Sequence, residues 1–224
     1  MVDGLVGSEM CIRDRINDIL DLAKIESGNM SVFNERFDSV KIIEEILTTM
    51  QPIARKGNNK LIVKSANEIP QLYSDAIKFR QILINLLSNA CKFTENGKIS
   101  VLVSHDEVNN KLIYHITDSG IGMSPDQLQH IFEAFVQAET DTAKEYGGTG
   151  LGLAICRQFV ELMEGSLDVT SAVGEGTTFT IILPVRPKAA KKHDVIPTEN
   201  QQELGLKIAD STDAGEATPT VLLG

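Results

Sequence analysis

From Phe79 to Ile99 the chain reads FRQILINLLSNACKFTENGKI, and within this stretch the spacing of apolar residues changes from helical to alternating. The helical spacing predicts a helix from about Asp75 to Lys92, because apolar residues recur every three or four positions. Its buried stripe would be Ile77, Ile82, Leu83, Leu86, Leu87 and Ala90. Asn96-Gly97 then predicts a tight turn, and the alternation that follows predicts a strand over 99–103 paired with residues 111–118.

Helical and alternating spacings of apolar residues also recur on both sides of this stretch. A short extended stretch is expected over 32–37, and Asp38 after it is a plausible N-cap for a helix that ends before Gly57. That helix would bury Val40, Ile43, Ile46, Leu47, Met50 and Ile53. Further strands are expected at 60–65, 166–170 and 177–185, with helices opening at Ser124-Pro125 and over about 150–163. Mixed helices and largely antiparallel strands predict an α/β (α+β) two-layer sandwich.

Composition divides the chain into five parts. Residues 1–15 lack periodicity and are interpreted as a non-native or disordered leader. Residues 16–30 would contain a short amphipathic helix that Gly28 ends. Residues 31–186 would be the globular domain, followed by a polar linker over 187–218. The ending PTVLLG, residues 219–224, resembles the opening of a further buried strand.

Charge and cysteine content exclude several kinds of protein. The formal charge of −10 and the isoelectric point near 4.9 argue against a nucleic-acid groove, which needs clustered basic residues. The three cysteines, Cys11, Cys91 and Cys156, show no metal-ligand spacing and are expected to be free thiols in a reducing compartment. No apolar run approaches the length of a membrane span, so we expect a cytoplasmic location for this portion.

Two glycine segments could approach a ligand closely. In DSGIGM, Asp118 ends a strand and Gly120 and Gly122 follow it. In GGTGLGL, from Gly147 to Leu153, the glycines open a helix whose free N–H groups suit phosphate oxygens. Neither segment has the spacing of a Walker A loop or of a dinucleotide fingerprint. Either one alone would be explained equally well by a structural turn.

A polar face on the long helix is the third feature. Asn85 and Asn89 lie four residues apart and therefore on one helical face, with Lys92 adding a cation nearby. Amide oxygens can ligate Mg²⁺ together with phosphates. Two helical asparagines bonded to neighbouring backbone would be the ordinary alternative for this pair.

Read in order, these motifs resemble those of sensor histidine kinases. The stretch that opens this section resembles their N box, DSGIGMSPDQLQHIFEAFVQAE their first glycine box and F box, GGTGLGLAIC their second glycine box, and GEGTTF their final glycine turn. The upstream INDILDLAKIESG resembles the end of the second helix of their dimerisation and histidine-phosphotransfer domain. The resemblance covers residues 16–185.

The resemblance implies a site for ATP and Mg²⁺. Asp118 would accept a hydrogen bond from the adenine amino group, Phe93 would lie against the adenine ring, and Gly120 and Gly122 would shape the pocket. Asn89 would ligate Mg²⁺, with Asn85 adjacent and Lys92 facing the phosphates. Thr177 would lie near the adenine. The phosphate end of a lid would contain Gly148, Thr149, Gly150, Leu151 and Gly152, anchored by Phe132 and Phe135 as core residues.

No residue of this chain is expected to form a covalent intermediate. Phosphoryl transfer depends mainly on positioning and charge stabilisation, and the acceptor would be a histidine some tens of residues before INDILDL. We therefore expect no autophosphorylation by this chain. His105, His115, His130 and His193 are interpreted as structural or solvated residues.

The expected partners are the protein's own dimerisation domain, as a homodimer, and a response-regulator receiver domain, which PTVLLG indicates as a C-terminal fusion. Whether the full-length protein is anchored in the inner membrane stays open. Two alternatives also remain: an ATPase of the same fold that transfers phosphate to water, and a non-catalytic nucleotide-binding module. Asn85 disfavours the first, since no acid stands where such ATPases carry a general base.

Overall fold

The computed structural model describes residues 16, 19–66, 68–135 and 150–187, all within one compact unit that spans residues 1–192. The predictions for the leader, the linker and PTVLLG lie outside these residues. So do the predictions for Cys11, Gly148, Thr149 and His193.

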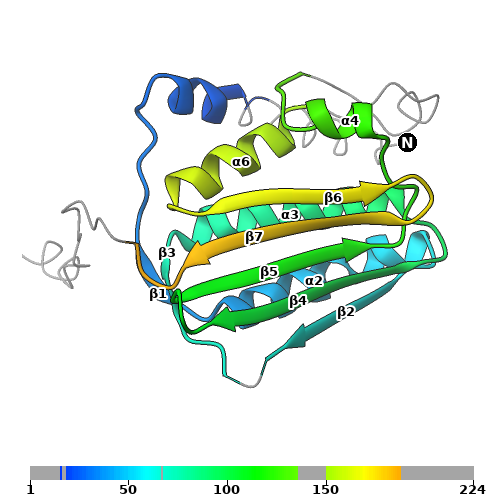
Figure 1. The fold of residues 1–224 in the computed structure, drawn as a ribbon, viewed down its shortest axis with the longest axis horizontal. Coiled ribbons are helices and arrows are strands. Elements are labelled where there is room, and N and C mark those ends of the chain that lie inside the picture. Colours follow the sequence, from blue (N-terminus) through cyan, green and yellow to red (C-terminus); the bar gives the residue numbers. More distant parts are fainter. Residues whose placement is uncertain (1–15, 17–18, 67, 136–149, 188–224) are drawn as a thin grey trace, which may run out of the picture. The chain divides into compact units, whose positions relative to one another are not determined.

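A five-stranded sheet forms the centre of the domain, in the order β2-β4-β5-β7-β6 (Figure 1). Its strands are β2 (Lys60–Ser65), β4 (Lys98–Asp106), β5 (Lys111–Asp118), β6 (Ser166–Ala172) and β7 (Gly176–Pro184). β2 pairs with β4 in parallel, and all other neighbours in this sheet are antiparallel. The predicted hairpin and the largely antiparallel sheet are thus confirmed, while the parallel β2–β4 pairing was not predicted.

Three helices cover one face of this sheet: α2 (Ser39–Lys56), α3 (Ala76–Phe93) and α6 (Gly152–Leu162). The other face, toward the viewer in Figure 1, carries no described helix. This arrangement confirms the predicted two-layer sandwich. A shorter helix, α4 (Pro125–His130), begins at Ser124 with the reciprocal hydrogen bonds of a capping box, and Pro125 occupies its first turn as expected.

The buried stripes of α2 and α3 follow the predicted period with two corrections. Ile53 and Ile77 were expected in the core but are 51% and 75% exposed. Along α2 the buried positions step from Met50 to Ala54, which leaves Ile53 at the edge of the stripe. Along α3 the step back from Ile82 reaches Phe79, a residue absent from the predicted stripe, and Ile77 falls out of phase.

A small second sheet lies beside the domain and was only half predicted. β1 (Glu35–Phe37) corresponds to an extended stretch that the sequence indicates, whereas its antiparallel partner β3 (Leu72–Ser74) was missed. Phe37 brings this sheet into the core, because its ring lies 5.5 Å from that of Phe79. The Phe79 ring in turn lies 5.1 Å from Tyr114 on β5. β1 and β3 are therefore held by the same aromatic cluster that joins α3 to the main sheet.

Residues 19–26 are helical and precede the domain. Gly28, with φ of 68°, ends the helix as predicted, since its N–H donates to Ile25 and the N–H of Asn29 donates to Lys24. Leu22 and Ile25 pack against the core.

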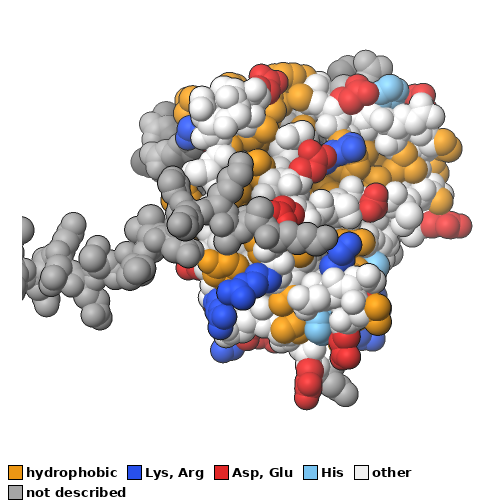
Figure 2. Space-filling model, turned by 60° about the vertical axis from the view of Figure 1, so that its left-hand side comes forward, with side chains coloured by type: hydrophobic (Ala, Val, Ile, Leu, Met, Phe, Trp, Pro, Cys, Tyr) orange, Lys and Arg blue, Asp and Glu red, His pale blue; other side chains and the backbone are white. Residues whose placement is uncertain are grey.

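No described helix is long and apolar enough to cross a membrane. Figure 2 turns the β1–β3 end forward and shows basic, acidic and hydrophobic side chains interspersed rather than a basic stripe.

Candidate functional site

Asp118 ends β5 between Ile99 of β4 and Thr177 of β7 and is only 8% exposed. Its Oδ1 accepts a hydrogen bond of 2.8 Å from the backbone N–H of Gly120. Burial raises the pKa of this carboxyl, and hydrogen bonding from the backbones of Gly120 and Thr177 offsets part of that effect. No ion pair within the described residues involves Asp118. The carboxylate is thus desolvated and free to accept a polar hydrogen from a ligand.

The glycines around Asp118 are required by close backbone packing. A Cβ at Gly120 would overlap the carbonyl oxygen of Phe93, and one at Gly122, where φ is 66°, would overlap that of Ala172. A Cβ at Gly176, where φ is 94°, would overlap the carbonyl oxygen of Asp118 itself. The three glycines therefore bring β5, the end of α3 and the β6–β7 turn together around the carboxylate.

Thr94 is a site residue that the sequence did not indicate. It caps the C-terminus of α3, is fully buried, and its carbonyl accepts a 2.6 Å hydrogen bond from the Asn59 amide. The Thr94 hydroxyl lies beside Asp118 and helps to lower the pKa of that carboxyl, although it makes no hydrogen bond within the usual distance and angle limits. Thr94 closes the quoted motif NLLSNACKFT, but only the folded backbone shows that its hydroxyl points toward Asp118 and not toward solvent.

The polar face of α3 leads away from Asp118 toward α6. The Asn85 Nδ2 lies 3.5 Å from the Gly152 carbonyl and 3.6 Å from the Cys156 Sγ, so this amide contacts the first turns of α6. Asn89 is partly buried, and its amide makes no hydrogen bond within the described part of the chain. The Lys92 ammonium stands 4.8 Å from the centre of the Phe93 ring, and burial lowers its pKa.

The second glycine segment is described from Gly150 onward. Gly150 has φ of 69° and its carbonyl accepts a 3.1 Å hydrogen bond from the N–H of Phe135. The Leu151 side chain lies in the hydrophobic core at 1% exposure, so this side chain does not face a ligand. Phe132 packs against the core as predicted, whereas Phe135 was wrongly assigned there: it is 68% exposed and has φ of 67°.

A magnesium ion fits these residues only with ligands from elsewhere. Among the described residues there is no group of three or more His, Cys, Asp or Glu side chains that could hold a metal. The unbonded amide of Asn89 can supply one oxygen, and Mg²⁺ commonly takes one or two protein ligands with the rest from phosphates and water. The donor set is therefore suited to a cation that arrives with a polyphosphate.

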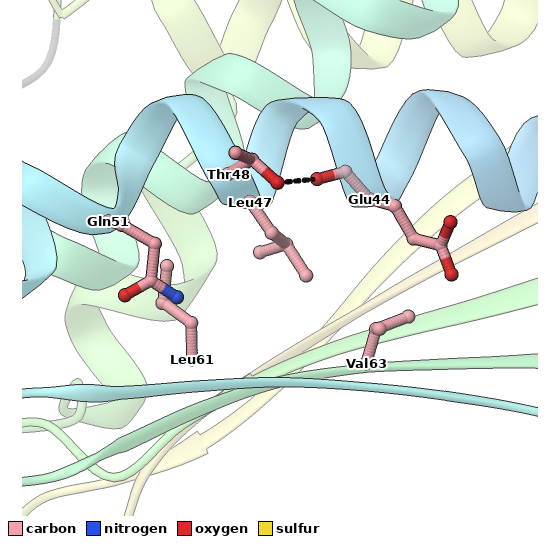
Figure 3. A pocket seen from close by; sticks show the side chains of 6 residues that line it. All are labelled: Glu44, Leu47, Thr48, Gln51, Leu61 and Val63. Atoms are coloured by element: carbon pink, nitrogen blue, oxygen red, sulfur yellow. Dashed lines mark hydrogen bonds between the residues drawn. The ribbon is translucent and has the colours of Figure 1, made fainter.

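A hollow in the described surface lies away from these residues. A pocket of about 200 Å³ opens between α2 and the edge strand β2 (Figure 3). It is lined from α2 by Glu44, Leu47, Thr48 and Gln51, and from β2 by Leu61 and Val63. It contains none of the site residues predicted above.

Taken together, the two-layer fold, the buried unpaired carboxylate and the two glycine segments define an ATPase-type nucleotide-binding domain. The family described as histidine kinase-, DNA gyrase B-, and HSP90-like ATPase matches residues 74–187, and the chain belongs to this family as a catalytic domain of the sensor histidine kinase type.

Named relatives and a solved structure agree with this assignment. The chain is 38% identical to the autoinducer 2 sensor kinase/phosphatase LuxQ of Vibrio harveyi, over 77% of this chain and 21% of that protein. It is 40% identical to the circadian input-output histidine kinase CikA of Synechococcus elongatus, over 75% of this chain and 22% of that protein. The structure of full-length ShkA in complex with AMPPNP superposes with a TM-score of 0.73 at 29% identity, over 82% of this chain and 38% of that one. The chain thus spans about a fifth of the length of these relatives.

Proposed function

We propose that this chain binds Mg-ATP and presents the γ-phosphate to a histidine on a dimerisation domain, as the catalytic part of a two-component kinase. The observation that carries this proposal is the buried carboxylate of Asp118, which has no cationic partner among the described residues and stands at the junction of α3, β5 and the β6–β7 turn. A desolvated carboxylate is costly unless a donor satisfies it. The adenine amino group would supply that donor.

The other residues would each contact a different part of the nucleotide. Phe93, which is 39% exposed, would lie against the adenine ring, with Thr177 and Thr94 near its polar edge. Asn89 would supply an amide oxygen to Mg²⁺, and Lys92 would face the phosphates. Gly150 and Gly152, with Gly148 and Thr149 before them, would offer backbone N–H groups to the phosphates. When bound, Mg²⁺ would offset the negative charge on the β- and γ-phosphates.

Asn85 has a more specific role in this proposal than adjacency to the metal. Because its amide contacts the Gly152 carbonyl and Cys156, it would hold the start of α6 against α3. An asparagine at this position cannot remove a proton from water. This favours transfer to a protein acceptor over hydrolysis by a general base, as in an ATPase that uses water.

The names of the relatives support the wider setting. LuxQ is named a sensor kinase/phosphatase and CikA a histidine kinase, and ShkA was solved with AMPPNP, an analogue of ATP. By analogy, the acceptor would be a dimerisation and phosphotransfer domain of a homodimer. The phosphoryl group would then pass to a response-regulator receiver domain.

Titration calorimetry and phosphotransfer together test this function. ATP should bind the chain in the presence of Mg²⁺, and binding should be strongly weakened in Asp118→Asn and Asn89→Ala. A supplied histidine-bearing dimerisation domain should then become phosphorylated on histidine when ATP is added. Unchanged affinity in both variants would refute the site, and release of free phosphate without any histidine phosphorylation would favour a water-directed ATPase.

A further inference from the structure

Two helices of this domain begin with the same arrangement of an aspartate and a lysine three residues later. Asp38 caps α2 by accepting hydrogen bonds from the N–H groups of Val40 and Lys41, and the Lys41 ammonium lies 3.8 Å from its carboxylate. Asp75 caps α3 in the same way, and the Lys78 ammonium lies 2.9 Å from its carboxylate. The local capping chemistry is therefore equivalent at the two sites.

The environments of the two pairs differ sharply. The side chains of Asp38 and Lys41 are 40% and 76% exposed, whereas those of Asp75 and Lys78 are 3% and 11% exposed. A helix cap does not require such burial, and burying an ion pair carries a desolvation cost. The Asp75 pair therefore has a structural task that the Asp38 pair lacks.

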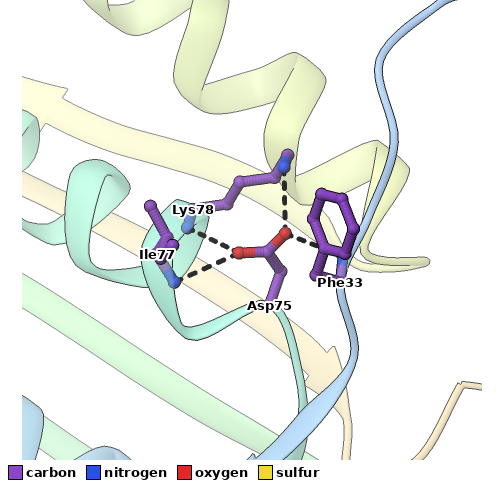
Figure 4. Close-up of polar contacts among 4 residues, drawn as sticks. All are labelled: Phe33, Asp75, Ile77 and Lys78. Atoms are coloured by element: carbon purple, nitrogen blue, oxygen red, sulfur yellow. Dashed lines mark hydrogen bonds and ion pairs between the residues drawn. The ribbon is translucent and has the colours of Figure 1, made fainter. Parts of the chain in front are cut away.

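That task is visible in the second carboxylate oxygen of Asp75. Its Oδ1 serves the helix cap, while Oδ2 accepts a 3.0 Å hydrogen bond from the backbone N–H of Phe33 as well as the contact from Lys78 (Figure 4). Phe33 belongs to the segment of residues 29–34, which joins the helical residues 19–26 to β1. Its own side chain is 59% exposed, so this segment is tied here through the main chain and not by burial of the ring.

Lys78 extends the connection to a third element. Its ammonium stands 5.7 Å from the centre of the Phe159 ring, which is buried on α6. One buried carboxylate and its lysine thus join the entry segment, the start of α3 and the C-terminal half of α6. α3 carries Asn85, Asn89 and Lys92, and α6 begins at Gly152.

We propose that Asp75 is a positioning residue that fixes the entry segment, and with it the N-terminal helix, against the two helices that carry the nucleotide site. It acts through Phe33 and Lys78 and touches no substrate. The functional meaning rests on the proposed kinase function, in which the N-terminal helix belongs to the domain that bears the acceptor histidine. The orientation of that helix would then set how the γ-phosphate meets the acceptor.

Asp75→Asn, with Asp38→Asn as its matched control, tests this role. Asparagine remains a good N-cap, so α2 and α3 keep their caps in both variants. Only Asp75→Asn removes the charge that faces the N–H of Phe33 and the Lys78 ammonium. We expect exchange of the Phe33 amide hydrogen to be at least tenfold faster in Asp75→Asn and unchanged in Asp38→Asn.

The orientation of the helix is measured separately by spin labels at Lys24 and Val108, both exposed, in a Cys11→Ser background, because Cys91 and Cys156 are buried. The distance distribution between the labels should broaden in Asp75→Asn and stay unchanged in Asp38→Asn. Affinity for ATP should stay within twofold in both variants. An unchanged distribution and unchanged Phe33 exchange in folded Asp75→Asn would overturn the proposal.

A second pair of variants covers the case in which Asp75→Asn fails to fold. Phe33→Pro removes the single donor N–H and leaves the cap of α3 intact, whereas Ser31→Pro places proline at an exposed position whose N–H makes no hydrogen bond among the described residues. Broadening in Phe33→Pro alone supports the proposal, and equal behaviour of the two variants contradicts it. If the unaltered chain fails to bind ATP, the kinase function is wrong, but these distance and exchange results still decide the role of Asp75.

Discussion

The Asp118 carboxylate accepts a 2.8 Å hydrogen bond from the N–H of Gly120, a residue that in turn lies against the Phe93 carbonyl, where no Cβ would fit. A short loop thereby holds a buried charge at the end of α3. The geometry separates two consequences of changing Asp118, one for the ligand and one for the stability of the fold.

Asp118→Asn should weaken ATP binding without weakening the fold. Losing a charged hydrogen-bond acceptor typically costs about 1.5–3 kcal/mol, which corresponds to roughly 10- to 100-fold in affinity. Because burial raises the pKa of Asp118, the folded state holds the proton more tightly than the unfolded chain does. Stability therefore falls as pH rises from the ordinary value of 3.8 through the raised pKa, and the penalty persists above it.

Asparagine does not titrate, so the variant should lack this fall. Thermal unfolding without nucleotide, measured from pH 3.5 to 8, should show Asp118→Asn gaining stability relative to the unaltered chain as pH increases. A variant that loses stability relative to the unaltered chain as pH rises toward neutral would contradict the assigned direction of the pKa shift.

Thr94 offers a test of how Asp118 is oriented. Thr94→Val keeps the shape of a fully buried side chain and removes a hydroxyl that has no hydrogen-bond partner in the structure, so the fold should be at least as stable. If the hydroxyl helps to hold Asp118 or the adenine edge, ATP affinity should fall by about 3- to 10-fold, in keeping with one neutral hydrogen bond. Thr94→Ser should restore it. Equal affinities in calorimetry for the Val and Ser variants would show that the hydroxyl has no part in binding.

Two glycines at the β6–β7 turn allow the cost of backbone strain to be compared with the cost of strain plus a steric clash. Gly174 has φ of 81° with open space around it, whereas Gly176 has φ of 94° and stands against the Asp118 carbonyl. Gly174→Ala should cost about 1 kcal/mol, the usual penalty for alanine in a left-handed conformation. Gly176→Ala should cost more than 3 kcal/mol in urea unfolding, because the backbone of β7 or β5 must also shift. Similar losses in the two variants would show that the turn relaxes freely.

Much of this fold follows from sequence periodicity, and the exceptions have physical causes. The caps at Asp38 and Ser124 and the turn at Gly28 were predictable because the relevant contacts lie within five residues. β3 was missed because a three-residue strand contains too little alternation to be recognised, and it exists only through pairing with the distant β1. Phe135 was misplaced because an aromatic residue in an apolar motif is ordinarily buried, whereas a backbone at φ of 67° turns this one outward.

The candidate site shows the same division. The motifs indicated Asp118, Asn89 and the glycines by residue type and order, and the structure brings Asp118, Phe93 and Gly120 together. Thr94 and the Asn85–Gly152 contact were not predictable, since each depends on how α3 packs against elements far away in the sequence. The buried Asp75–Lys78 pair was hidden for a similar reason, because Asp38 and Lys41 have the same spacing but remain exposed.

The buried pair should be far more sensitive to truncation than its exposed counterpart. Lys78→Met keeps the apolar stem but leaves the Asp75 carboxylate buried without its cation, and breaking such a pair typically costs about 3–5 kcal/mol. Lys41→Met breaks the exposed pair, which is worth at most about 1 kcal/mol. Urea unfolding should therefore show a large loss for Lys78→Met and almost none for Lys41→Met. Restoration of most of that loss in the double variant Asp75→Asn/Lys78→Met would confirm that the unpaired charge is the cause.

His130 provides a readout of local charge at the end of α4. Its ring Nδ1 lies 2.9 Å from Glu133, and this hydrogen bond, reinforced by the charge of Glu133, raises the pKa of the imidazole above its ordinary value of 6.5. The folded state therefore favours the protonated ring, and the interaction is fully present below the ordinary pKa and is lost as pH rises through the raised one. Glu133→Gln should bring the midpoint of the His130 ring-proton NMR titration back toward 6.5, with His115, whose Nδ1 lies 3.1 Å from the Thr180 hydroxyl, as an internal control. A His130 midpoint that does not move in Glu133→Gln would show that the pair does not persist in solution.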